Sequence, residues 1–255
     1  IALTFDDGPG EYTSELLDCL EENNAHATFF MLGQNVQNYQ DDVKRMLELG
    51  CEIGNHSWDH ANMYELSLDS VVKEFNDADQ ALIDACGQAS TVVRAPYGNA
   101  NEDIMNAVGK PFFMWSLDSL DWKYKDVDLD YKSIMQDNSS VIKDGTIILM
   151  HDIHEPSVKA AERIIPELIN MGFKLVTVSE MAEAKNVTLQ NASYNNFWQD
   201  ILDEGLVPGY AGNSTSDADT SDSTEDSSDG SEDGSSSDGS EDYSDGSEDG
   251  SNSSE

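Results

Sequence analysis

Basic residues are scarce in this chain of 255 residues: 13 Lys and Arg stand against 51 Asp and Glu, for a formal net charge of −38. The acids are unevenly spread, because residues 211–255 hold 15 of them and no Lys or Arg. The rest of the chain still carries 36 acids against 13 bases and is acidic in its own right. Such a surface repels nucleic acid and anionic membranes, so neither is expected as a partner.

Cysteines and long apolar runs are also scarce. The three cysteines, Cys19, Cys51 and Cys86, show no Cys-x-x-Cys spacing. An odd number cannot pair completely within one chain, so we expect buried free thiols, with one disulfide as the alternative. No apolar stretch is long enough to cross a bilayer, which excludes membrane insertion within this sequence. The chain opens directly in an apolar, strand-like run, so we expect a fragment whose signal peptide or anchor lies upstream.

Apolar runs rich in β-forming residues alternate with segments of helical period. Strands are predicted at residues 1–5, 27–32, 51–54, 91–94, 112–116, 146–150 and 174–178. Helices are predicted at residues 14–23, 36–49, 70–86, 102–108, 130–139, 158–171 and 179–184. About seven β–α repeats indicate a parallel sheet covered by helices, either a barrel or a doubly wound sheet. In both folds the functional side chains gather at the C-terminal ends of the strands.

The composition changes near the C-terminus, which divides the chain into three parts. Residues 1–186 form one α/β domain, and residues 187–210 form an extension in which a short amphipathic helix around Trp198 packs on the sheet. Residues 211–255, rich in Ser, Asp, Gly and Glu, are predicted to be a disordered tail, because they cannot bury enough apolar surface. A calcium-binding repeat is the alternative for the tail, although no closing Glu follows its EF-hand-like start.

Two polar clusters follow the first and third predicted strands. The first, Asp-Asp-Gly-Pro at residues 6–9, also suits a plain turn. The second, residues 56–60, contains His56 and His60, which at this spacing would share one helix face and could bind one metal ion. One carboxylate of the Asp-Asp pair would complete three protein ligands and leave a position for water.

Three further clusters follow later strands, and each has a plain structural alternative. Arg94 can hold a carboxylate through two hydrogen bonds, although most arginines before a turn lie on the surface. Asp118 and Asp121 could be loop acids that face solvent. His151, at the mouth of a buried strand, is a candidate general acid, although a lone histidine there is more often structural. Five such clusters in succession favour one shared active site.

These five segments, in this order, resemble the motifs of the polysaccharide deacetylase family, also called the NodB-homology domain or carbohydrate esterase family 4. The matching stretches are residues 4–9 (TFDDGP), 56–60 (HSWDH), 94–98 (RAPYG), 118–122 (DSLDW) and 149–151 (LMH). Residues 27–30 and 176–181 are also similar to the family, and the resemblance runs from residue 1 to about residue 185. One departure is Ala95, where many members have proline.

The resemblance implies a distorted (β/α) barrel with about seven repeats, in which residues 1–186 are the catalytic domain. It implies that Asp7, His56 and His60 bind a divalent metal, with zinc expected and cobalt as the alternative. It implies these further roles: general base Asp6, general acid His151, Arg94 orienting the base, Asp121 pairing with the acid, the Tyr97 backbone N–H in the oxyanion hole, and Trp122 and Leu149 lining the pocket for the acetyl methyl.

The activity implied by the resemblance is removal of N-acetyl groups from N-acetylglucosamine residues of a polysaccharide. Residues 150–155 (MHDIHE) resemble the bacterial peptidoglycan branch, so peptidoglycan is the expected polymer. Chitin oligosaccharides and acetylated xylan are alternatives, because the same machinery serves them. A catalytically silent glycan-binding module is the alternative outside enzymes. The implied location is extracellular or associated with the cell wall, and a monomer is the default state.

Overall fold

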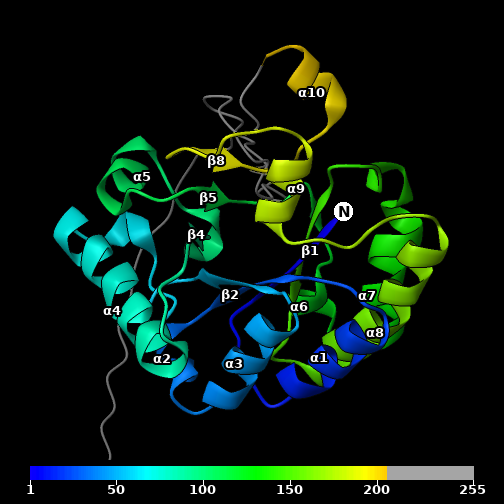
Figure 1. Ribbon diagram of the computed structural model, residues 1–255, viewed down its shortest axis with the longest axis horizontal. Helices are drawn as coiled ribbons and strands as arrows, with labels where there is room; N and C mark the ends of the chain where they lie inside the picture. Colours follow the sequence, from blue (N-terminus) through cyan, green and yellow to red (C-terminus); the bar gives the residue numbers. More distant parts are fainter. Residues whose placement is uncertain (206–255) are drawn as a thin grey trace, which may run out of the picture. The chain divides into compact units, whose positions relative to one another are not determined.

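The computed structural model describes residues 1–205, in which eight strands form one parallel sheet surrounded by helices (Figure 1). The strands are β1 Ala2–Asp6, β2 Thr28–Met31, β3 Glu52–Asn55, β4 Val92–Val93, β5 Phe112–Phe113, β6 Leu117–Asp118, β7 Ile147–His151 and β8 Ser193–Tyr194. The predicted tail, residues 211–255, lies outside the described residues.

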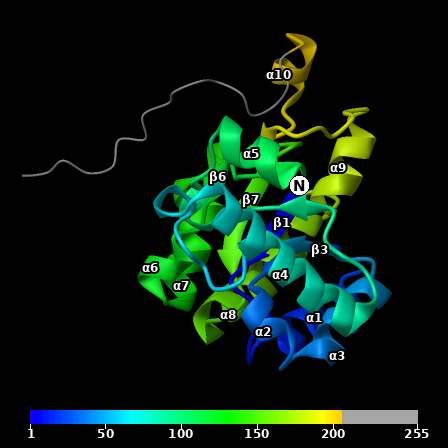
Figure 2. The same cartoon turned by 90° about the vertical axis from the view of Figure 1, so that its left-hand side faces the viewer.

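Helices fill most of the connections between the strands and cover the outside of the sheet, as a second view shows (Figure 2). They are α1 Thr13–Glu22, α2 Gly33–Val36, α3 Gln40–Glu48, α4 Leu68–Cys86, α5 Glu102–Val108, α6 Asp121–Tyr124, α7 Val127–Lys132, α8 Glu155–Asn170, α9 Val178–Ala184 and α10 Gln199–Asp203. None of the helices in residues 1–205 is both long and apolar enough to span a membrane.

Helix α4 shows how the sequence produces these elements. Its buried residues recur every three or four positions, so one face packs against the rest of the domain; they are Val71, Phe75, Ala78, Leu82 and Ala85. The Ser67 hydroxyl caps the first turn by accepting a hydrogen bond from the Ser70 N–H. Gly87 ends the helix in the left-handed conformation, with φ 87°.

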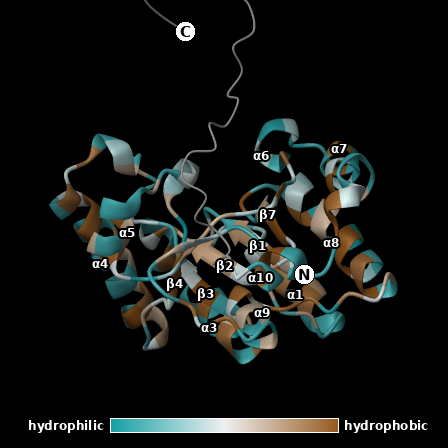
Figure 3. Cartoon of the chain, turned by 90° about the horizontal axis from the view of Figure 1, so that it is seen from above, coloured by the Kyte–Doolittle hydropathy of each residue, from teal (hydrophilic) through white to brown (hydrophobic). Residues whose placement is uncertain are grey.

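The strand order identifies a distorted barrel and not a doubly wound sheet. The order is β6-β7-β1-β2-β3-β4-β5-β8, so β1 to β5 follow one another in one direction and β7 returns beside β1. A doubly wound sheet would reverse direction at a switch point. From above, the strands lie at the centre and the helices form a ring around them (Figure 3). The carboxyl ends of the parallel strands therefore share one end of the barrel.

The segment after α9 contacts the sheet through aromatic side chains. Strand β8 pairs with β5, and Tyr194 stacks on both Phe113 and Phe197, at centroid distances of 5.3 and 5.9 Å. Gly145 is required at this junction, because a Cβ there would lie 2.2 Å from the Phe197 carbonyl oxygen. No residue of α10 is fully buried, so packing comes from the residues before this helix.

The structure corrects a predicted strand, a predicted helix and the expected burial of the three thiols. Residues 174–178 are not a strand: the Val176 N–H donates to the Ile1 carbonyl, and Thr177 already caps α9. The helix predicted at residues 130–139 begins earlier, at the Asp126 cap of α7, and continues as a π-helix from Ser133 to Asp137. The thiols are free, as expected, but only two of the three are buried.

Candidate active site

The strand register brings the predicted clusters together. Asp6, the last residue of β1, pairs in register with His151, the last residue of β7. Asn55 ends β3 beside Val93 of β4, so the next residue on each strand carries a predicted functional side chain. The strand-end rule used on the sequence therefore holds for β1, β3, β4 and β7.

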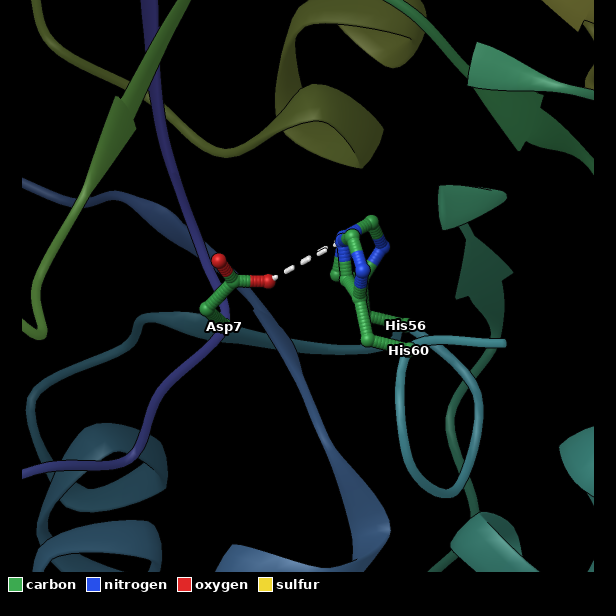
Figure 4. Close-up of side chains that lie close together, drawn as sticks. All are labelled: Asp7, His56 and His60. Carbon is green, nitrogen blue, oxygen red and sulfur yellow. Dashed lines mark ion pairs between the residues drawn. The ribbon is translucent and has the colours of Figure 1, made fainter. Parts of the chain in front are cut away.

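Asp7, His56 and His60 form a compact cluster, although about fifty residues separate them in sequence (Figure 4). Asp7 Oδ1 lies 3.5 Å from His56 Nε2 and 3.4 Å from His60 Nε2. Two ligand atoms on a tetrahedral zinc ion, each about 2.0–2.2 Å from it, are separated by about 3.4 Å. The spacing therefore fits one shared ion, and within residues 1–205 this is the one group of metal-ligating side chains found.

Asp7 supplies independent support for a cation. Its Oδ1 is buried and has no hydrogen-bond partner among the described residues. An unpaired buried carboxylate oxygen is costly, and a metal ion would remove the cost. The backbone holds this orientation: Asp7 has φ 70°, and its carbonyl accepts a hydrogen bond from Asn35 Nδ2 at 2.9 Å.

His56 is prepared for metal binding through its other ring nitrogen. Its Nδ1 lies 2.8 Å from the Arg94 carbonyl oxygen, which can only accept, so Nδ1 carries the proton and Nε2 keeps its lone pair. Burial lowers the pKa of His56 to about 3, against the opposing charge of Asp7. The imidazole is therefore neutral at ordinary pH, as a ligand must be.

The two histidines do not share a helix face, so that part of the prediction is wrong. Residues 56–60 form a loop in which Ser57 and His60 have positive φ, 75° and 68°. The Asn55 side-chain oxygen accepts from the Ser57 N–H at 2.8 Å, and Ser57 Oγ accepts from the His60 N–H at 3.1 Å. These bonds set the two rings 5.0 Å apart.

Asp6 lies beside the metal cluster and is 3% exposed. Its Oδ2 lies 3.6 Å from His56 Nε2, and its Oδ1 accepts a hydrogen bond from Arg94 Nη1 at 2.7 Å. Burial raises the pKa of Asp6, and the Arg94 charge limits the rise. The carboxyl is thus a stronger base than an exposed aspartate.

Arg94 is fully buried, and all of its nitrogens are engaged. Besides Asp6, it donates to Thr4 Oγ1 at 2.8 Å and to the carbonyls of Phe113 and Met114 at 2.8 and 2.9 Å. Its guanidinium also lies over the Phe30 ring. The surface-arginine alternative is excluded, and this network fixes the orientation of the Asp6 carboxylate.

His151 forms a second pair with Asp121, which is fully buried, whereas His151 is partly exposed. His151 Nδ1 lies 2.8 Å from Asp121 Oδ1, and the His151 backbone N–H donates to Oδ2 at 2.7 Å. Burial lowers the pKa of His151, but the hydrogen bond and charge of Asp121 outweigh it and raise the pKa to about 9. The imidazole therefore carries a proton at neutral pH.

The remaining predicted residues surround these pairs. Tyr97 has φ 59°, uncommon for a bulky residue, and its ring packs edge-on against His60 at 4.5 Å. Trp122 follows Asp121 and is half exposed, whereas Leu149 is buried two residues before His151, on the same side of β7. No contact joins Trp122 to Leu149 among the described hydrogen bonds and ring contacts.

Sequence reasoning gave no role to Asp152, although it follows His151 directly. This carboxyl is fully buried, accepts a hydrogen bond from Thr13 Oγ1 at 2.5 Å, and keeps one oxygen without a partner in residues 1–205. A Cβ on Gly8 would lie 2.3 Å from it, so it touches the loop that carries Asp7. Asp152 belongs to the stretch at residues 150–155, which on sequence grounds indicated only the type of polymer.

A parallel barrel with a two-histidine, one-carboxylate cluster at the C-terminal ends of its strands defines a class of metal-binding (β/α)-barrel proteins. The polysaccharide deacetylase model matches residues 1–111. The peptidoglycan-N-acetylmuramic acid deacetylase PdaC of Bacillus subtilis is 41% identical over 186 residues, which cover 72% of this chain and 39% of that protein. The peptidoglycan-N-acetylglucosamine deacetylase PgdA of Listeria monocytogenes is 37% identical over 182 residues, covering 71% and 38%.

Two solved structures of deacetylating enzymes match this chain over most of their own length. A T48 deacetylase with substrate is 38% identical with a TM-score of 0.71, and the match covers 76% of this chain and 95% of that one. A family 4 acetyl xylan esterase from Clostridium thermocellum, in complex with cobalt, is 31% identical with a TM-score of 0.70, covering 76% and 97%. The chain belongs to the polysaccharide deacetylase family, as its motifs predict. It spans about two fifths of the length of PdaC and PgdA.

Proposed function

We propose that this chain is a zinc-dependent hydrolase that removes N-acetyl groups from N-acetylglucosamine residues of peptidoglycan. One observation carries the proposal: a three-ligand cluster lies directly beside the buried carboxyl of Asp6, and a protonated His151 ends the neighbouring strand. An acid and a base on two sides of an ion site are what amide hydrolysis requires. Peptidoglycan is proposed as the polymer because two similar proteins, PdaC and PgdA, are named peptidoglycan deacetylases.

Asp7, His56 and His60 would hold the ion, which supplies Lewis-acid polarisation of the acetamide carbonyl. Asp6 takes the proton of the attacking water, and its raised pKa suits this task because a catalytic base works best near the operating pH. Arg94 keeps the Asp6 carboxylate pointed at the water through its 2.7 Å hydrogen bond. The remaining contacts of Arg94 allow it no other position.

His151 protonates the departing amine, which cannot leave as an anion. Its pKa of about 9 keeps the proton available at neutral pH, and Asp121 holds the ring in place. The Tyr97 backbone N–H stabilises the oxyanion, a contribution of about 3–4 kcal/mol for one such donor. Trp122 and Leu149 enclose the acetyl methyl.

The substrate class implies where the protein works. Peptidoglycan lies outside the cytoplasmic membrane, so the proposed location is extracellular or within the cell wall. We further propose residues 1–186 as the catalytic domain, residues 187–210 as an extension on the barrel, and a monomeric state. The polysaccharide is the proposed partner, and the activity of any longer protein that contains this chain is part of the same proposal.

Two neighbouring activities compete with this one. Acetylated xylan is favoured by the structural similarity to the cobalt-bound esterase, and chitin oligosaccharides by a chitin deacetylase from Pestalotiopsis that is 35% identical over 175 residues. A silent glycan-binding module is the least supported alternative, because Asp6, His151 and the three ligands are all in place.

The test is acetate release by metal-free protein before and after addition of zinc or cobalt. Three substrates are compared side by side: peptidoglycan, N-acetylchitopentaose and acetylated xylan. We expect no release without metal and the highest kcat/KM on peptidoglycan. Release only from xylan would replace the proposed substrate, and no release from any polymer with metal bound would leave the binding-module alternative.

A further inference from the structure

Unpaired positive charge is rare in this acidic chain. All 13 Lys and Arg lie in the described residues, and ten of them make an ion pair with a carboxylate. The exceptions are Lys123, Lys125 and Lys174. Carboxylates outnumber bases almost threefold outside residues 211–255, so a lysine without a partner is not explained by a shortage of acids.

Two of these three lysines belong to one short segment: Lys123 lies in the single turn of α6 and Lys125 ends it. We call residues 122–125 the Trp122–Lys125 turn. Asp121 is buried, and the next four residues, Trp122, Lys123, Tyr124 and Lys125, are all exposed. The Trp122 and Tyr124 side chains are 50% and 39% exposed, among the largest exposed hydrophobic groups of the domain. Aromatic rings and ammonium groups therefore alternate on one solvent-facing turn.

The turn is held rigidly at the active site. Helix α6 packs against β7, the strand that ends in His151 (Figure 3). The Lys125 N–H donates to the Asp121 carbonyl at 3.0 Å, and the same aspartate holds His151. Leu120 and Lys125 bound the turn in the left-handed conformation, with φ 59° and 48°. Residues other than glycine seldom adopt a positive φ, and those that do are found more often at functional sites.

The Lys125 charge reaches the same region as the catalytic pair. Burial and then the Lys125 ammonium lower the pKa of His154, whereas Asp121 raises it. His151 also acts on this imidazole. Lys125 directly follows the turn of α6 that begins with Asp121, the partner of His151, so its backbone is fixed beside the acid pair.

We infer that the Trp122–Lys125 turn binds a carboxylate-bearing sugar next to the reacting one, with Tyr124 against the sugar ring and Lys123 and Lys125 on the carboxylate. The inference rests on the proposed function and adds a preference for anionic glycans over neutral ones. In an alternating peptidoglycan strand, a reacting N-acetylglucosamine has N-acetylmuramic acid on each side. The lactyl carboxylate of that neighbour is the anion expected at the turn.

The surrounding charge favours one small anion over a polyanion. Charges act over roughly 8 Å at physiological salt, so the two lysines attract an anion only near the turn. A nucleic acid or a phosphate polymer would extend beyond them onto the acidic surface and be repelled. The carboxylate could also come from a peptide attached to the sugar, and the experiment separates these sources.

The experiment measures acetate release by the zinc-loaded full chain at 50 mM NaCl on peptide-free peptidoglycan strands and on N-acetylchitopentaose. The double substitution Lys123→Gln with Lys125→Gln should raise KM on the anionic strands and lower the ratio of kcat/KM, anionic over neutral, about fivefold, because exposed charge contacts are individually weak. Raising NaCl to 500 mM should reduce that ratio in the unmodified chain and leave it unchanged in the double variant.

The matched control is Lys174→Gln, the third unpaired lysine. Its carbonyl accepts a hydrogen bond from the Ile1 amine, at the start of β1 and thus at the opposite end of the barrel. This substitution should leave the ratio unchanged. Peptidoglycan strands that keep their peptides are a further substrate in this experiment. If the double lysine substitution slows deacetylation only of these strands, the carboxylate belongs to the peptide. If it also slows deacetylation of the peptide-free strands, the carboxylate belongs to the sugar.

This design distinguishes a failure of the proposed function from a failure of the inference about the Trp122–Lys125 turn. If the unmodified chain releases acetate from neither glycan, the proposed function fails and the inference fails with it. If it deacetylates the anionic strands but the double substitution leaves the ratio unchanged, or if it acts on chitopentaose alone, the inference is overturned and the metal-dependent hydrolase stands.

Discussion

Replacing Asp121 with asparagine should move the pH range of the enzyme. Burial alone would lower the pKa of His151 below 6.5, yet it stands at about 9, and Asp121 is the largest contributor to the rise. Because one pKa unit corresponds to 1.36 kcal/mol, the net preference for the imidazolium is about 3 kcal/mol. The Asp121→Asn variant keeps a side chain of the same shape and removes most of that preference.

The sign of the pH effect follows from the proposed role of His151 as the general acid. A general acid must be protonated, so activity falls as pH rises through its pKa. The alkaline limb of kcat/KM should therefore lie near pH 9 in the unmodified chain. It should move toward pH 7 in Asp121→Asn, with a loss of about tenfold at pH 8 and a smaller loss at pH 6.

The assay is acetate release at subsaturating substrate from pH 5 to pH 10, with metal content measured at each pH. Asp126→Asn is the matched control, because Asp126 caps the neighbouring helix α7 and does not touch His151. An alkaline limb at the same pH in the unmodified chain and in Asp121→Asn would refute the pairing argument, even if the variant were slower.

Three further substitutions test other parts of the site. His56→Ala should abolish metal binding, measured by elemental analysis after dialysis, whereas Asp6→Asn should keep the metal and lose turnover; the reverse pattern would exchange their roles. Gly8→Ala should lower the free energy of unfolding by about 1–3 kcal/mol through overpacking against Asp152, and more than Gly10→Ala, whose Cβ meets its nearest atom at 3.3 Å. Asp130 is buried, and neither of its carboxyl oxygens has a hydrogen-bond partner among the described residues. Burial, and to a smaller extent the negative charge of Asp121, raises the pKa of Asp130 to about 7. A raised carboxyl pKa destabilises the fold as pH rises toward it, so Asp130→Asn should gain about 2 kcal/mol more at pH 8 than at pH 5 in urea unfolding; equal gains would refute this.

The strand-end rule explains why so much of the site could be predicted. Asp6 and His151 each end a buried apolar run, and parallel strands place such residues side by side. The residues alone left a barrel and a doubly wound sheet open, because both fold types share the β–α alternation. Only the order of the strands distinguishes them, and strand order depends on contacts between distant segments.

The loop at residues 56–60 shows where sequence reasoning reached its limit. The four-residue spacing of His56 and His60 suggested a helix, but the side chains of Asn55 and Ser57 close a tighter loop. Periodicity cannot reveal a conformation set by side-chain hydrogen bonds to the backbone. Strands of two residues, such as β6 and β8, are likewise too short to show an alternating pattern.

Two buried carboxyls in this site have pKa values that move in opposite directions, and this difference fits the roles proposed for them. Burial raises the pKa of both Asp6 and Asp121. For Asp121, the ring and backbone N–H of His151 outweigh burial, and the pKa falls below its ordinary value. For Asp6, a single arginine bond does not outweigh burial. The carboxyl that binds protons more readily is suited to accept one from water, and the carboxylate that stays ionised is suited to hold a charged imidazole.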